Sequence, residues 1–365
     1  MSTTSNAPGG AAVGTARAKR EKPYSYCNLP VVPPRELSRD VNPFRAQLIR
    51  LNEQKWTNGT VLHYHFMDTP AEWKGAEDQK QAVRKAFEAW KSVDIGVPFQ
   101  EVQNRNDAEI RIGFLDGDGA WSYVGRDVLD QGRDDRTMNF GWDIRGDIDT
   151  AIHEIGHTLG FPHEHQNPRA GIVWDEEAVY AALAGPPNFW PRDQTFHNII
   201  RKILPDLVQG SNWDADSVMH YPFEAGLIRQ PEQYRNGLQP AGGLSARDRE
   251  WVRTFYPALS EADYQVLEPF KSLPLNIAAG QQVNLRLTPK VSRRYNIGTF
   301  GASDTVMVLF LEDSDGNVRY LAGDDDSGAD RNSLIQRRLL AGRNYIVRIR
   351  LYYAESYDET AVMAW

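Results

Sequence analysis

The sequence contains a single cysteine, Cys27, among 365 residues. One cysteine cannot form a disulfide within the chain, so nothing in the sequence marks an oxidising compartment. The sequence also lacks any apolar run of about eighteen residues, the length that a membrane-spanning helix needs. It has no long run of lysine and arginine, and its net charge is −8. Neither nucleic acid nor a membrane is therefore favoured as a partner.

Residues 1–22 contain no aromatic side chain and no apolar block. They are rich in Ser, Thr, Gly, Ala and charged residues, so we predict that they are disordered. A secretory signal needs an apolar stretch of about 7–15 residues behind a basic start, and this segment has none. We expect either a cytoplasmic protein or export by a route without such a signal.

The most informative stretch begins at His153 and reads HEIGHTLGFPH. Residues four apart on a helix share a face, so His153 and His157 can present two imidazole nitrogens to one metal ion. Gly160 can adopt the left-handed conformation that ends a helix, after which the chain can bring His163 to the same ion. Three neutral nitrogen ligands suit Zn²⁺ and leave a position for water, which is typical of a catalytic zinc site.

Two separate motifs carry a resemblance to a known family. The stretch from His153 is similar to the long zinc-binding motif of the metzincin metallopeptidases. Phe161 and Glu164 narrow this resemblance to the astacin subfamily (peptidase family M12A). Ser217–Tyr221, which reads SVMHY, is similar to the astacin Met-turn. Weaker similarity extends from about Trp56 to Pro257.

The resemblance implies an α+β metzincin catalytic domain over residues 51–258, with a twisted mixed sheet and a zinc-binding helix. It also implies a zinc metalloendopeptidase that cleaves peptide bonds in proteins, with Glu154 as the general base for a zinc-activated water. The ligands of the one catalytic zinc ion would be His153, His157, His163 and, as a displaceable fifth ligand, Tyr221.

Other residues take roles from the same resemblance. Tyr221 would also stabilise the oxyanion of the tetrahedral intermediate, and Met219 would form an apolar floor below the metal ligands. Glu164 would orient the base of the site or pair with a processed amino terminus, with a surface salt bridge as the alternative. Arg229 lies near the region that gives the family its preference for an acidic residue after the scissile bond. We interpret three further histidines as non-ligands: His165, His197 and His220.

The substrate is expected to be a protein or peptide bound as an extended strand, and the enzyme is expected to be a monomer. Residues 137–142 are predicted to be the last strand before the zinc helix and, by the family pattern, the edge of the sheet. An unpaired edge can add a peptide as one more strand. Apolar patterns also predict strands over residues 60–67 and 109–114, and a helix over 77–91.

Residues 1–50 combine the tail with a proline-punctuated segment that lies where the family carries its prosegment. Cys27 falls in this segment, and two interpretations are open. A thiolate is a strong zinc ligand, so Cys27 can occupy the open position and keep a zymogen latent. The other interpretation, which the sequence favours, is a small, partly buried hydrophobic residue.

A second domain is predicted over residues 273–365, after a linker at 259–272. Short β-type runs alternate with turns, which is typical of a β-sandwich. Several of its segments, among them Asp324–Gly328, resemble the bacterial pre-peptidase C-terminal (PPC) domain, a jelly-roll module. The aspartates of that segment are hard oxygen ligands that can bind Ca²⁺, and a solvated acidic turn is the alternative.

Two other functions are compatible with the motifs. The first is a zinc-binding but catalytically silent protein-binding module. The second is a metzincin peptidase of another subfamily, in which Tyr221 is not a zinc ligand.

Overall fold

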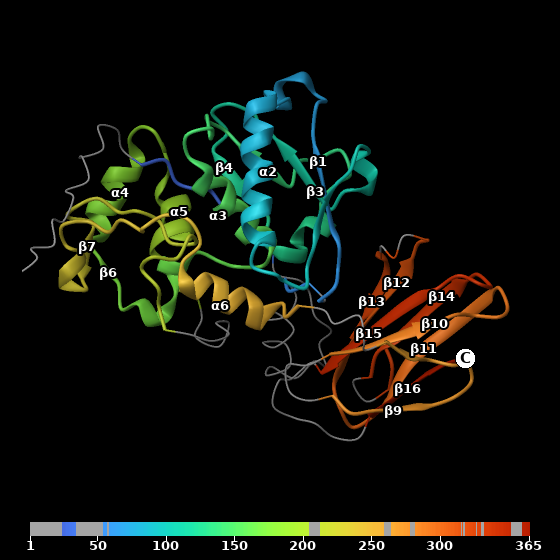
Figure 1. Cartoon of the computed structure of the whole chain (residues 1–365). Coiled ribbons are helices and arrows are strands. Elements are labelled where there is room, and N and C mark those ends of the chain that lie inside the picture. Colours follow the sequence, from blue (N-terminus) through green and yellow to red (C-terminus); the bar gives the residue numbers. More distant parts are fainter. Residues whose placement is uncertain are drawn as a thin grey trace, which may run out of the picture.

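The computed structural model describes residues 24–33, 54–56, 58–203, 212–258, 264–277, 282–314, 316, 318–325, 327–329, 332–351 and 360–365. The predicted disordered tail and most of the predicted prosegment lie outside these residues. Figure 1 shows an α+β part, coloured blue to yellow, and a part made of strands, coloured orange and red. None of the helices in the described ranges has the length and apolar character that crossing a bilayer requires.

A five-stranded mixed sheet is the framework of the first part, with the strand order β2-β1-β3-β5-β4. The first four of these strands run parallel, and β4 is antiparallel to β5. The strands predicted over residues 60–67, 109–114 and 137–142 are confirmed as β1, β3 and β5. The five strands are β1 (Leu62–Phe66), β2 (Phe99–Glu101), β3 (Ile110–Gly113), β4 (Ala120–Ser122) and β5 (Met138–Phe140).

The edge of this sheet differs from the prediction, because β5 lies between β3 and β4 and the edge strand is β4. The side chain of Asn139, at the centre of β5, explains the return of the chain. Its Nδ2 donates to the carbonyls of Leu115 (3.2 Å) and Gly119 (2.8 Å), which fixes the turn between β3 and β4. β4 therefore folds back beside β5 and forms the edge of the sheet.

Two helices pack together beside the sheet (Figure 1). The helix predicted over residues 77–91 is confirmed as α2 (Glu77–Lys91), and the residues of its apolar stripe are buried. Trp90 at its end donates from Nε1 to the Ile152 carbonyl at 2.9 Å. Ile152 belongs to α3 (Ile148–Thr158), so this bond positions the helix that carries the histidine motif.

The segment after α3 forms a smaller lobe around an aromatic-rich cluster. Its regular elements are β6 (Val173–Trp174), α4 (Glu176–Ala184), α5 (Arg192–Thr195), the π-helix η6 (Phe196–Ile200) and β7 (Ile228–Gln230). The next helix, α6 (Ala246–Phe255), packs through Val252 against the core of the main sheet instead. Short 3₁₀ helices complete the first part: η1 (Ala71–Trp73), η2 (Arg105–Asp107), η3 (Gly125–Asp130), η4 (Glu164–Gln166), η5 (Pro168–Ala170) and η8 (Glu232–Tyr234).

The second part consists of two sheets with the orders β13-β12-β15-β10-β8 and β14-β11-β16-β9. Apolar side chains from both sheets form one core. The strands are β8 (Tyr264–Val266), β9 (Leu273–Leu275), β10 (Gln282–Leu287), β11 (Arg293–Gly301), β12 (Thr305–Glu312), β13 (Val318–Asp324), β14 (Leu334–Leu339), β15 (Tyr345–Leu351) and β16 (Thr360–Ala364).

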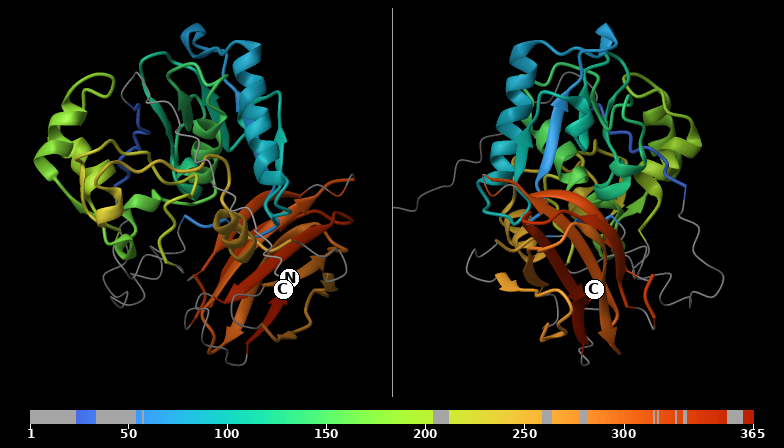
Figure 2. Two further views of the ribbon diagram at one scale, coloured as in Figure 1. Left: turned by 60° about the vertical axis from the view of Figure 1, so that its left-hand side comes forward. Right: turned by 90° about the vertical axis from the view of Figure 1, so that its right-hand side faces the viewer.

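The predicted linker at residues 259–272 is shorter than expected, because it contains β8. This strand pairs in parallel with β10, and Leu267 directly after it is buried in the core. The two parts of the chain also touch. Val61, just before β1, packs against a small apolar cluster that includes Phe310 and Ile346. These two residues lie on the outer side of the sheet β13-β12-β15-β10-β8 of the second part. The right-hand view of Figure 2 shows this sheet below the first part.

Candidate metal centre and cleft

The histidine motif folds as its spacing predicts. Its first two histidines lie one turn apart on α3, and the helix ends before Gly160, whose φ is +93°. His153 donates from Nδ1 to the Val218 carbonyl at 2.8 Å, and His157 donates from Nδ1 to the Phe161 carbonyl at 2.7 Å. These bonds leave a lone pair on each Nε2, and the two Nε2 atoms lie 3.0 Å apart. Two converging lone pairs repel each other unless a cation lies beside them, so this donor set fits a metal ion.

His163 is the third histidine of this group, and the side chains of Cys27 and Tyr221 lie beside it. The ligand atoms of His153, His157, His163 and Cys27 all lie within 4.8 Å of one another, and all four residues are buried. The Tyr221 hydroxyl lies 2.5 Å from His163 Nε2. Three nitrogens, a sulfur and a phenol thus surround one point, and this combination suits Zn²⁺ better than Ca²⁺ or Mg²⁺.

Burial keeps the three histidines in the neutral form that binds metals. It lowers the pKa of His153 to about 4. Burial, together with the neighbouring histidines, lowers the pKa values of His157 and His163 well below the usual value. Burial also raises the pKa of Glu154 to about 8.

Glu154 lies beside the predicted ligands. Its Oε2 accepts a hydrogen bond from the Cys27 thiol at 3.4 Å, and its Oε1 has no partner among the described residues. Burial and this carboxylate raise the pKa of the thiol well above its usual value, whereas a divalent cation beside the sulfur favours the thiolate.

The Met-turn lies below α3, as the sequence predicts. A Cβ on Gly156 would overlap the Met219 sulfur, so the close approach of the turn requires glycine at this position. Asp248 at the start of α6 holds the turn from the other side. Its carboxylate accepts hydrogen bonds from Ser217 Oγ at 2.7 Å and from the Val218 amide at 2.8 Å.

The other charged residues that the sequence singled out lie around this centre. Glu164 accepts hydrogen bonds from the Asp214 amide (3.0 Å) and from Asn167 Nδ2 (3.2 Å), so it is not a surface salt bridge. Burial raises its pKa to about 7. The guanidinium of Arg229 is exposed and pairs with Asp175 at 3.1 Å.

Two of the histidines interpreted as non-ligands bond to main-chain carbonyls through one ring nitrogen each. His165 Nε2 lies 3.0 Å from the Asn198 carbonyl, and His220 Nδ1 lies 2.7 Å from the Tyr221 carbonyl. The third is His197, which lies in the π-helix η6.

The described part of the N-terminal segment, residues 24–33, runs between the edge strand β4 and the smaller lobe (Figure 2, left, dark blue). The Asn28 amide donates to the Ala120 carbonyl of β4 at 3.0 Å. From the opposite side, Tyr221 donates its hydroxyl proton to the Cys27 carbonyl at 2.8 Å. The segment therefore occupies the cleft between β4 and the smaller lobe, and its Cys27 lies beside the three histidines.

Two asparagines of the smaller lobe bind the same segment, and the sequence analysis missed both. Asn188 Oδ1 accepts from the Tyr26 amide at 3.1 Å, and its Nδ2 donates to the Tyr24 carbonyl at 3.0 Å. Asn198 Oδ1 accepts from the Leu29 amide at 3.0 Å. No motif surrounds either asparagine, so their positions could not be inferred without the fold.

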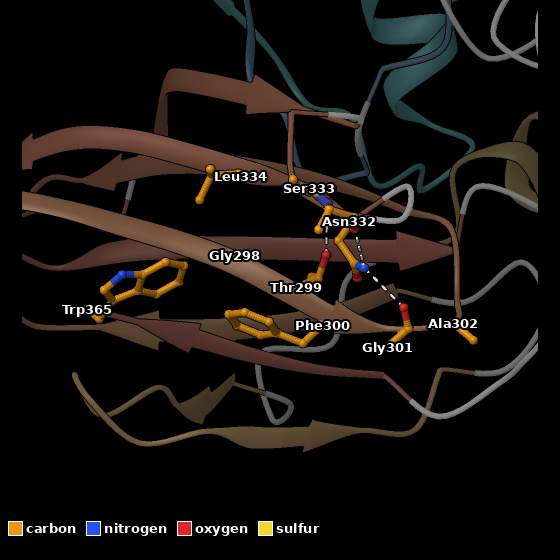
Figure 3. A pocket seen from close by; sticks show the side chains of 11 residues that line it. Gly298, Thr299, Phe300, Gly301, Ala302, Asn332, Ser333, Leu334 and Trp365 are labelled. Carbon is orange, nitrogen blue, oxygen red and sulfur yellow. Dashed lines mark hydrogen bonds between the residues drawn. The ribbon is translucent and has the colours of Figure 1, made fainter. Parts of the chain in front are cut away.

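The second part of the chain presents a groove without catalytic groups, lined by apolar and small polar side chains and with a volume of about 670 Å³. Figure 3 shows Phe300 and Trp365 side by side along it, and their ring centroids are 5.6 Å apart. The carboxylate of Asp324 accepts from the Ser327 amide (3.0 Å) and the Leu334 amide (2.7 Å), as in a solvated turn. Calcium binding by this acidic segment, which includes an aspartate outside the described residues, stays a prediction.

Comparisons with known proteins agree with the geometry. The family model described as Astacin (Peptidase family M12A) matches residues 48–175. The chain is 32% identical over 148 residues to zinc metalloproteinase nas-36 of Brugia malayi, a match that covers 40% of this chain and 22% of that protein. It is 30% identical to Tolloid-like protein 1 of Mus musculus over 198 residues, which cover 50% of this chain and 18% of that protein.

A solved structure gives the most complete match of those described here. The structure of myroilysin shares 30% sequence identity with this chain, with a TM-score of 0.52. The match covers 57% of this chain and 98% of that one. The two curated relatives named above are much longer than their matched regions, since the chain spans less than a quarter of each.

Proposed function

Because this chain belongs to the astacin family of zinc metallopeptidases, we propose that it is a zinc-dependent metalloendopeptidase that acts on proteins or peptides. One observation carries this proposal above all others. The ligand atoms of three buried histidines converge within 4.8 Å of one another, next to the carboxylate of Glu154. Burying so many polar groups together costs stability, and a metal-dependent reaction accounts for that cost.

The residues that would hold zinc are His153, His157 and His163, with Tyr221 as a displaceable ligand. Zinc, when bound, supplies Lewis-acid chemistry that acidifies water and polarises a carbonyl oxygen.

Glu154 is the general base in this proposal. It takes a proton from the attacking water, whose oxygen bonds to the carbonyl carbon of the substrate. The same carboxyl then gives the proton to the leaving nitrogen as the C–N bond breaks. Tyr221 donates a hydrogen bond to the carbonyl oxygen as negative charge develops there. The bond from its hydroxyl to the Cys27 carbonyl supports this role, because it shows that the phenol reaches a main-chain carbonyl in the cleft.

The N-terminal segment keeps this peptidase latent in our proposal. The Cys27 sulfur lies among the predicted ligands, and the segment lies in the cleft that a substrate would need. As a thiolate, Cys27 would be a fourth zinc ligand and would exclude water from the metal. Activation then requires removal or displacement of the segment.

Casein hydrolysis by three forms of the full chain tests both proposals: the parent, Cys27→Ala, and Cys27→Ala combined with Glu154→Ala. We expect little activity from the parent, because its thiol and segment block the centre. Cys27→Ala should be more active, and the added Glu154→Ala should abolish that activity although the zinc content stays the same. A chelator should silence the active form.

The outcomes separate the two ideas. If Cys27→Ala is no more active than the parent and removal of the segment by limited proteolysis restores activity, the peptidase proposal stands and latency through the thiol is wrong. If zinc is bound and no form cleaves casein or a peptide mixture, the peptidase proposal is wrong.

A further inference from the structure

The wall of the cleft opposite β4 contains Asn188 and Asn198, and the side chains of both asparagines bind the main chain of the N-terminal segment. Asn188 forms two hydrogen bonds with it, one to the amide of Tyr26 and one to the carbonyl of Tyr24. In a parallel sheet, one residue bonds in the same way to the two neighbours of the residue that faces it. The Asn188 side chain therefore replaces a strand on this side of the cleft.

Asn198 extends the same wall past the metal centre. Its Oδ1 accepts from the Leu29 amide, and its Nδ2 donates to the Gln194 carbonyl and to the side-chain oxygen of Asn28, each at 3.1 Å. It is buried in the π-helix η6, an element that often occurs at functional sites. Main-chain bonds of this kind do not depend on the side chains of the bound peptide.

One side chain of the segment fills a defined pocket. Tyr26 is buried next to Cys27, and its ring centroid lies 5.1 Å from that of Tyr221, 5.8 Å from that of Phe223 and 6.3 Å from that of Trp190. Ring separations of 4.5–7 Å are those at which aromatic side chains attract each other beyond simple burial. The pocket is therefore shaped for a large aromatic group next to the residue at the metal.

From these contacts we infer that Asn188 is a positioning residue for the main chain of the substrate, and that the aromatic pocket is the specificity-determining part of the cleft. The asparagine holds an extended peptide by its main chain opposite β4, and the pocket of Trp190, Tyr221 and Phe223 selects a tyrosine, phenylalanine or tryptophan side chain. The preferred substrates are peptides with an aromatic residue at one fixed position within two residues of the scissile bond. This inference rests on the proposed peptidase function. It does not depend on chain direction, because rotation of an amide side chain exchanges its donor and acceptor.

The binding of the segment's main chain by Asn188 can be measured without catalysis, because Cys27 in that segment is the sole cysteine of the chain. The rate at which a disulfide reagent modifies this thiol in the full chain reports how often the segment leaves the cleft. Loss of two main-chain bonds in Asn188→Ala should raise this rate about tenfold. Loss of the ring in Tyr26→Ala should raise it by about tenfold or more. Asn106→Ala, at an exposed asparagine on η2, is the matched control and should leave the rate unchanged.

The selectivity is measured by mass spectrometry of the sites that full-length Cys27→Ala cleaves in a mixture of peptides. We expect aromatic residues to be enriched at one position. A peptide with alanine in place of that aromatic residue should show a kcat/KM about tenfold lower. Phe223→Leu in the same background should weaken this preference, whereas Asn188→Ala should lower kcat/KM for all peptides alike.

The two measurements fail independently. If the thiol reacts at the same rate in Asn188→Ala and in the Asn106→Ala control, the inference that Asn188 holds the peptide main chain is wrong. Cleavage without an aromatic preference at any position overturns the pocket assignment while the peptidase function stands. If cleavage is absent but the thiol rates change as expected, the peptidase proposal is wrong and the wall is a peptide-binding site only.

Discussion

The two parts of the chain bury different kinds of side chain. The core of the first part, to which we assign the catalytic function, adjoins a cluster of buried histidines with a glutamate and a cysteine, and several of their polar atoms lack a hydrogen-bond partner among the described residues. The core of the β-sandwich is formed by apolar side chains such as Leu285, Val347 and Ile349. A buried polar group without a partner lowers stability, whereas buried apolar surface raises it. The buried polar residues of the first part therefore serve the proposed reaction at a cost in stability, whereas the apolar residues of the sandwich core stabilise the fold.

Replacing one buried polar atom of the catalytic centre tests this separation most strongly. Glu154→Gln, made in the Cys27→Ala background, should lower kcat by about 10²–10⁴-fold, because the amide cannot accept the water proton. Its melting temperature should not fall, because the substitution removes a buried carboxylate whose Oε1 has no partner in the described structure. Peptide hydrolysis and calorimetry on the same sample check both statements. A large fall in melting temperature would show that the carboxylate also stabilises the fold.

The corresponding change in the sandwich should have the opposite pattern. Ile349 is fully buried on β15, between β10 and β12. Ile349→Ala should destabilise the sandwich by about 2–5 kcal/mol, because it removes apolar contacts and leaves a cavity. Calorimetry should show a lower transition for this domain, while peptide hydrolysis per folded molecule stays the same. Loss of hydrolysis at a temperature where both domains remain folded would show that the sandwich acts in catalysis.

The same contrast explains how much could be predicted from the sequence. Helix α3 and the three histidines of the motif fall within a short stretch of chain, so helical spacing and one glycine define their geometry. Cys27 reaches the centre across 127 residues from Glu154, and Asn188 lies 162 residues from the amide that it binds. No local pattern encodes such long-range contacts.

Strand β14 was not predicted, for a related reason. β1 and β3 lie in runs of apolar and β-branched residues, and both were predicted. β14 carries a central run of three exposed polar residues, and its edge position is set by pairing with β11 rather than by its own alternation. The edge of the catalytic sheet was assigned to β5 because family order, and not the hydrogen bonds of Asn139, guided the prediction.

Gly156 lies on α3 between His153 and His157, and it also packs against the apolar core through Met219 and Trp90. A methyl group here would press on the Met219 sulfur and, at 3.2 Å, on the Trp90 ring. Gly156→Ala should therefore destabilise the catalytic part by about 1–3 kcal/mol through overpacking. Zinc affinity should fall as well, because His153 and His157 flank the displaced turn of α3. Calorimetry and zinc titration check this, and the sandwich transition should not move.

Lys55 lies at the junction of the two parts, and its replacement should have the smallest effect on stability of the changes considered. Its partly buried ammonium lies 3.9 Å from the centroid of the Phe255 ring. Burial, with Arg350 of the sandwich adding repulsion, lowers the pKa of Lys55 to about 7. Between pH 7 and the ordinary lysine pKa near 10.5, the unfolded chain therefore binds the proton and the folded chain does not, so stability rises with pH across this window.

Lys55→Met removes that dependence. It should raise the unfolding free energy by about 1 kcal/mol at pH 6–7, because the favourable contact with the Phe255 ring offsets part of the burial penalty. The gain should shrink as the pH rises towards 10, where the parent lysine is neutral in both states. Melting temperatures of the two proteins from pH 6 to 10 measure this, with Lys91→Met, which carries a more exposed ammonium on α2, as the control. A constant difference across the range would mean that the ammonium stays protonated at the junction and that the two parts meet without excluding water from it.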